Sequence, residues 1–127
     1  MRHLLLISLL LLMAACPGPD TAMTPLVFRA DEHGGVTTIL HEQPHKLTEI
    51  PVTVTFDSPP EWVTTTTMVA RVDMPGMPMN VAPVALIPVE EGVYKAVLVF
   101  TMSGPWYVEI AATGPETWSV RYDVDVP

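Results

Sequence analysis

The chain has 127 residues, with 14 acidic and six basic side chains and a formal net charge of −8 at neutral pH. This acidic balance excludes the basic surface that binds nucleic acid, and it argues against a polybasic contact with anionic lipid headgroups. A single cysteine rules out a disulfide within the chain, so a hydrophobic core must supply the stability of the fold.

The first 15 residues have the pattern of a secretory signal peptide and are excluded from the folded domain. Arg2 and His3 precede an apolar run over residues 4–13, which is shorter than the about 20 apolar residues that cross a bilayer. The run ends in Met13-Ala14-Ala15-Cys16, which resembles a bacterial lipobox, although Met13 stands where leucine is usual. We therefore expect Cys16 to be lipidated. The alternative is a free or buried thiol near an ordinary cleavage site.

Residues 16–25 predict a lipidated, flexible tether ahead of one domain over residues 26–127. The segment 17–25 contains proline, glycine and threonine without periodicity. Pro17 occupies the position where some bacteria place a retention aspartate, which favours an outer-membrane anchor in the cell envelope. The length after the leader suits one domain with a two-layer core.

Alternating apolar residues predict about seven short strands separated by Gly/Pro turns, and no stretch has sustained helical periodicity. This pattern favours an all-β fold, an antiparallel β-sandwich with immunoglobulin-like topology. Trp62, Trp106 and Trp118 are expected in its core. The predicted strands cover residues 36–41, 47–56, 62–74, 81–89, 93–102, 106–112 and 118–126.

Three segments in register carry a resemblance to a known family. They are RVDMPGMPM at 71–79, GVYKA at 92–96 and FTMSGPWYV at 100–108. With this order and spacing, residues 63–125 resemble the YtkA-like/FixH-like small bacterial envelope domains, whereas residues 26–60 carry no matching motif. The resemblance implies an immunoglobulin-like sandwich that is exported and often membrane-anchored. It also implies relatives linked to copper handling or to the assembly of copper-containing oxidases.

Methionines are concentrated around a Pro/Gly turn. Met74, Met77 and Met79 lie within six residues, and Met102 precedes the turn Ser103-Gly104-Pro105. Thioether sulfur is a soft ligand that selects Cu(I), so these four residues form a candidate copper site. Two alternatives remain, namely packing at the end of the sandwich and a partner-docking surface. Met68 is expected in the core.

The histidines give a misleading motif. His41-Glu42-Gln43-Pro44-His45 has the letters of the H-E-x-x-H zinc-protease motif, which requires a helix. Pro44 would break that helix, at a cost of about 3 kcal/mol, so we reject a protease. His33, His41 and His45 remain possible accessory ligands for Cu(II) or Zn(II), and the simpler interpretation is exposed loop histidines. No catalytic constellation can be assembled, and we expect no enzyme.

The sequence therefore leads to two hypotheses. The first is a lipid-anchored envelope domain that binds copper through its methionine-rich turn, as a carrier or an oxidase-assembly factor. The second is a structural or protein-interaction domain of the same fold that binds no metal and docks to a membrane complex.

Overall fold

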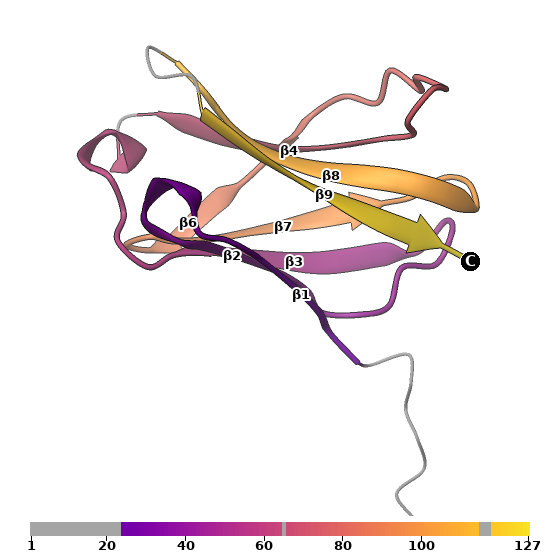
Figure 1. The fold of residues 1–127 in the computed structure, drawn as a ribbon, viewed down its shortest axis with the longest axis horizontal. Coiled ribbons are helices and arrows are strands. Elements are labelled where there is room, and N and C mark those ends of the chain that lie inside the picture. The colour runs from indigo at the N-terminus through magenta and orange to yellow at the C-terminus, as the bar shows by residue number, and fades with distance from the viewer. Residues whose placement is uncertain (1–23, 65, 115–117) are drawn as a thin grey trace, which may run out of the picture.

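The computed structural model describes residues 24–64, 66–114 and 118–127, and these residues fold into nine β-strands and two short 3-10 turns (Figure 1). None of these residues forms a helix long and apolar enough to cross a membrane. The elements are β1 (Leu26–Ala30), η2 (Glu32–Gly34), β2 (Val36–Leu40), β3 (Glu49–Phe56), η3 (Glu61–Thr64), β4 (Thr67–Asp73), β5 (Val84–Ala85), β6 (Ile87–Glu90), β7 (Val93–Val99), β8 (Gly104–Thr113) and β9 (Trp118–Val126).

The strands form two facing antiparallel sheets, so the predicted all-β antiparallel sandwich is confirmed. One sheet has five strands in the order β1-β2-β3-β7-β6, and the other has four in the order β5-β4-β8-β9. Figure 1 shows the four-stranded sheet above the five-stranded one. Nine strands replace the expected seven, because β1 is an additional strand and the predicted strand 81–89 divides into β5 and β6, which belong to different sheets.

The alternation in the sequence places one set of side chains between the sheets. In β8, Trp106, Val108 and Ile110 are buried, while Glu109 between them is partly exposed on the outer face. Strand periodicity of two residues predicts this arrangement. Aromatic side chains pack against one another in the interior. Phe100, for example, lies against Trp106, with ring centroids 5.4 Å apart. All the buried core residues lie within the range 36–126.

Pro51 marks the point where β2 stops pairing with β3. The His41 N–H donates to the Pro51 carbonyl at 3.0 Å, but proline has no N–H to return the second bond of the pair. The β2 ladder accordingly ends at Leu40, which pairs with Val52. A proline is thus accommodated at the third position of a central strand.

The predicted strand 62–74 is shorter than expected. β4 begins at Thr67, and Trp62 lies in η3, half-buried, with its ring centroid 6.0 Å from that of Trp118. Trp106 and Trp118 are buried as expected, but Trp62 packs against the core and is not inside it.

The two ends of the sandwich carry different connections. We call the end with the connections 41–48, 74–83 and 100–103 the methionine end; β1 starts there and β9 finishes there (Figure 1). The opposite end, called the far end, carries the connections from β1 to β2, from β3 to β4 and from β6 to β7. Strand direction alone thus brings connections that are distant in sequence to the same end.

Candidate functional site

The methionine-rich segment forms a tight turn at the end of β4. Met77 N–H donates to the Met74 carbonyl at 3.2 Å, and these two residues form an isolated antiparallel bridge. Pro75 and Gly76 occupy the two central positions, and Gly76 has φ +74°. Proline followed by a residue with positive φ is the pattern of a type II turn. The Pro-Gly pair therefore fixes the direction in which the chain leaves β4.

One carboxylate holds the rest of this segment against the strand. Asp73 Oδ1 accepts hydrogen bonds from the backbone N–H groups of Met74 and Met79, both at 2.8 Å. A charged acceptor makes stronger hydrogen bonds than a neutral one. Asp73 is partly buried at the end of β4, and its carboxylate binds the backbone on both sides of the turn.

The four candidate ligands differ in exposure. Met74 keeps only 7% of its surface and belongs to the core, and Met79 is half-buried against it. Met77 and Met102 are exposed, at 46% and 41%. Met68 is buried, as expected. The structure therefore separates two accessible thioethers from one that is enclosed.

Met74 connects the methionine turn to the turn before β8. A Cβ atom built on Gly104 would lie only 2.9 Å from Met74 Cε, so this side chain packs directly over the glycine. Met102 lies two residues earlier, and its carbonyl accepts a hydrogen bond of 2.9 Å from the Trp106 indole. The methionine turn and the Met102 turn are thus neighbours at the methionine end.

The histidines do not come together. His41 and His45 lie at the methionine end, where His41 Nε2 is 2.7 Å from Thr53 Oγ1. The backbone of His33 lies in η2 at the far end. Residues 41–42 form a bend and residues 43–45 are irregular, so the helix that H-E-x-x-H requires is not present. Within the described ranges, no three His, Cys, Asp or Glu side chains are placed to hold a metal ion.

The lipidation site lies outside the described residues. Cys16 and residues 17–23 of the tether are not described, and the description begins two residues before β1, at Thr24. β1, the first strand among the described residues, begins at Leu26.

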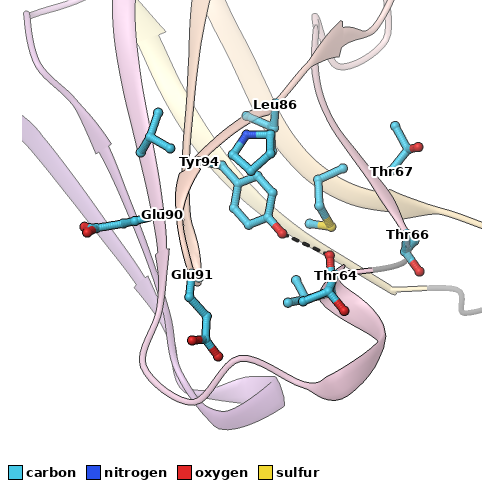
Figure 2. A pocket seen from close by; sticks show the side chains of 12 residues that line it. Thr64, Thr66, Thr67, Leu86, Glu90, Glu91 and Tyr94 are labelled. Carbon is cyan, nitrogen blue, oxygen red and sulfur yellow. Dashed lines mark hydrogen bonds between the residues drawn. The ribbon is translucent and has the colours of Figure 1, made fainter.

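The far end contains a cleft that the sequence did not predict. Its volume is about 860 Å³, in the range typical of ligand pockets, and Figure 2 shows Tyr94 in its middle, between Leu86 and Thr64. The Tyr94 hydroxyl donates to the Val63 carbonyl at 3.1 Å, and burial raises the pKa of its phenol. Glu90 and Glu91 point away from that hydroxyl.

This cleft has a polar rim without a basic group. Its lining combines threonine hydroxyls, two carboxylates and the Tyr94 phenol with apolar side chains, including Met68. The signal in the sequence was the run of threonines 64–67 beside the irregular segment 81–90, where β5 and β6 leave the edges of the sheets incompletely covered.

Comparison with known proteins identifies one family. The profile of the family described as YtkA-like matches residues 36–111, which is more than half of the chain. The match includes β2 and β3, in the region where no motif was recognised from sequence, and it ends within β8. No match was found among curated proteins or among solved structures. Both the extent of the profile and the order of the three sequence segments lead to one conclusion: the chain belongs to the YtkA-like family.

Proposed function

We propose that this chain is a lipid-anchored cell-envelope domain that binds Cu(I) through thioethers at the methionine end. It would act in copper handling or in the assembly of a copper-containing oxidase. Membership of the YtkA-like family supports an envelope-associated domain. The signal-peptide pattern and Cys16 support the anchor. The proposal includes no catalytic step.

One observation carries the metal proposal. Met77 pairs with Met74, and Met74 packs over Gly104, two residues from Met102, so two segments 25 residues apart in sequence bring thioethers to one place. Cu(I) prefers such soft ligands, while the absence of a three-residue His, Cys, Asp or Glu group in the described ranges gives harder ions no comparable site.

The four methionines would contribute unequally. Met77 and Met102 are exposed and need no rearrangement to meet an ion. Met79 is half-buried and is held by the bond from its N–H to Asp73. Met74 joins only if its side chain leaves Gly104. We assign Met77 and Met79, which lie two residues apart on one segment and can project to the same side, as the principal ligands, with Met102 and Met74 assisting.

A competition titration tests this assignment. Residues 17–127 contain the whole hydrophobic core, and they are titrated with Cu(I) against a chromophoric chelator at micromolar copper. We expect the wild type to withdraw copper from the chelator, and the double variant Met77→Leu/Met79→Leu to lose at least about tenfold in affinity, because leucine keeps the volume but removes the sulfur ligand.

The matched control is Met68→Leu, which removes a buried thioether far from the turn and should leave copper affinity unchanged. Absence of competition by the wild type, or equal affinities of the wild type and the double variant, would remove the copper proposal.

A second candidate is an interaction domain that binds no metal. The outer face of the five-stranded sheet exposes Val27, Ile87 and Val97, which are apolar side chains with no role in the sandwich core. Exposed apolar patches on small domains mark interaction surfaces. A failed copper titration together with a mapped contact on this face would favour this candidate.

A further inference from the structure

The direction of β1 determines which end of the domain lies nearest the N-terminal anchor. Leu26 begins β1 and pairs with Leu40, the last residue of β2, so the chain enters the sandwich at the methionine end. Residues 17–25 separate Cys16 from β1, and even fully extended they reach only about 30 Å. β8, with its ten residues, spans a similar length from one end of the sandwich to the other. A short tether thus enters at one end of an elongated domain.

The methionine end displays apolar side chains. Nine large hydrophobic side chains are exposed among the described residues, and four of them lie in the three connections at this end: Leu47, Met77, Val81 and Met102. The other five lie on the strands of the five-stranded sheet, and none lies in a far-end connection. The exposed apolar loops are therefore confined to the end where the tether enters.

Leu47 is the most exposed of these side chains, at 74%, and its backbone has φ +60°. Leucine adopts this left-handed conformation only at an energetic cost. The strained position is held by a hydrogen bond of 2.7 Å from Leu47 N–H to the Phe100 carbonyl, and by the bridge between Lys46 and Phe100. The backbone is strained here, and the apolar side chain that it holds faces solvent. This combination suggests that an apolar surface covers Leu47.

The number of carboxylates also differs between the two ends of the domain. The methionine-end connections 41–48, 74–83 and 100–103 contain one carboxylate, Glu42, and one ammonium, Lys46. Three more carboxylates lie on the bordering strand ends, those of Glu49, Asp73 and Asp125, and Asp73 is engaged by backbone N–H groups. The described far-end connections themselves contain five carboxylates, Asp31, Glu32, Asp57, Glu61 and Glu91.

Arg29 offsets part of the far-end charge through its ion pairs with Asp57 and Asp31. Counted with the bordering strand ends, both ends carry a net negative charge, and that of the far end is the larger. An anionic bilayer surface therefore repels the far end more strongly than the methionine end.

We propose that the methionine end is the surface on which the anchored domain contacts the lipid bilayer, with Leu47, Met77 and Met102 at the boundary between headgroups and acyl chains. The proposal rests on the anchor at Cys16 in the proposed function and not on copper. Tether attachment, apolar loops and low charge coincide at this end. A few apolar side chains at the interface add modestly to the membrane binding that a covalent lipid provides.

The test measures methionine oxidation in metal-free buffer with a chelator present. Residues 16–127 are coupled through the Cys16 thiol to a maleimide lipid in vesicles of dimyristoyl phosphatidylcholine and phosphatidylglycerol, which imitates the anchor. Sulfoxide formation at each methionine after peroxide treatment is followed by mass spectrometry. We expect Met77 and Met102 to oxidise at least about threefold more slowly in the coupled protein than in the uncoupled protein, because the bilayer covers exposed thioethers.

The control variant is Val89→Met, which places a thioether at a residue of comparable exposure, 52%, near the far end of β6. The oxidation rate of this added thioether should not change on coupling. Leu47→Asn keeps a residue tolerant of positive φ but removes the apolar side chain, and it should reduce the protection of Met77 and Met102.

Equal rates for Met77 and Met102 in coupled and uncoupled protein would overturn the proposal. Equal protection of the thioether added by Val89→Met would overturn it too, because the contact would then not be specific to one end. Protection that rises with protein concentration without lipid would assign this surface to a second copy instead. The copper titration fails or succeeds independently of these rates. The acyl mass on Cys16 of protein extracted from its own membrane tests the anchor separately.

Discussion

Tyr94 connects the five-stranded sheet to the connection before β4. Its ring is buried in the core, while its hydroxyl lies at the floor of the far-end cleft and donates to the carbonyl of Val63 in η3. Burial raises the pKa of this phenol, and it raises the pKa of Tyr122 as well, where the hydrogen bond from Thr38 partly opposes the shift. Both tyrosines are therefore neutral donors or acceptors over the ordinary pH range.

Removing the hydroxyl leaves a buried acceptor without its donor. In Tyr94→Phe we expect the free energy of unfolding at neutral pH to fall by about 1–2 kcal/mol, because the Val63 carbonyl loses this hydrogen bond. Urea denaturation followed by far-UV circular dichroism measures the change. Tyr107→Phe, on the outer face of β8, is the control and should change stability by less than about 0.5 kcal/mol.

The same variant has a pH signature. A phenol whose pKa is raised by folding favours the neutral form in the folded protein, so its stabilisation is complete below the unfolded pKa of about 10 and is lost as pH rises through the folded value. The wild type should lose stability above about pH 10, and Tyr94→Phe should lose it less steeply. If the two curves stay parallel, ionisation of Tyr94 is not linked to unfolding.

At the scale of elements, the methionine turn depends on the last residue of β4. The Pro-Gly pair sets the turn itself, but Asp73 determines where Met79 lies, because one carboxylate oxygen binds the N–H groups at both sides of the turn. The candidate site is thus built on a closed loop anchored to a strand and not on a free one.

Truncation of that carboxylate tests how much the loop depends on it. In Asp73→Ala we expect a loss of about 2 kcal/mol in unfolding free energy, because two partly buried hydrogen bonds to a charged group disappear. Amide hydrogen exchange at Met79 should accelerate more than exchange in β8. Asp73→Asn keeps an oxygen acceptor and should restore most of the protection.

Asp125→Ala is the matched control, since Asp125 is an exposed carboxylate on β9 with no such bonds in the described structure. Unchanged exchange at Met79 in Asp73→Ala would show that the Pro-Gly turn alone holds the loop. The copper affinity of the same variant would then report whether loop order matters for the metal.

The limits of sequence interpretation are visible in these same elements. Alternation in β8 and β9 indicates most of the buried positions, because a half-buried strand leaves a direct period-2 signature, but Tyr122 is only half-buried and Ala111 is buried out of phase. The start of the predicted strand 62–74 was wrong, because residues 62–64 belong to η3. Local hydrogen bonds hold this turn: Val63 N–H donates to the Pro60 carbonyl, and the Thr64 hydroxyl donates to the Glu61 carbonyl. The burial of Met74 and the dual role of Asp73 depend on contacts with distant residues, which periodicity cannot encode.

At the scale of the whole molecule, the two outer faces of the sandwich differ. The four-stranded sheet presents charged groups, including Arg71 3.9 Å from Glu109 and Arg121 over the ring of Tyr107 at 3.5 Å. The five-stranded sheet presents valine, isoleucine and proline beside Thr53 and Lys95, and a groove of about 530 Å³ lies along β3, β7 and β6. This asymmetry has no use within the domain, because the core already lies between the sheets.

Substitutions on the apolar face test whether it is a contiguous interaction surface or a set of isolated apolar side chains. Ile87 and Val97 line the groove and are both exposed, so the double variant Ile87→Thr/Val97→Thr removes apolar area without opening a cavity. Threonine keeps the β-branched shape that strands favour, and we expect the free energy of unfolding to change by less than about 1 kcal/mol.

Binding of the dye ANS to the native protein should fall by more than about half in that variant, because the dye reports contiguous exposed apolar surface. Leu47→Asn, at the methionine end and away from the groove, is the control and should leave most of the dye binding in place. If the double variant binds as much dye as the wild type, the exposed apolar residues of this sheet do not form one contiguous surface. The interaction-domain alternative would then lose the surface on which it depends.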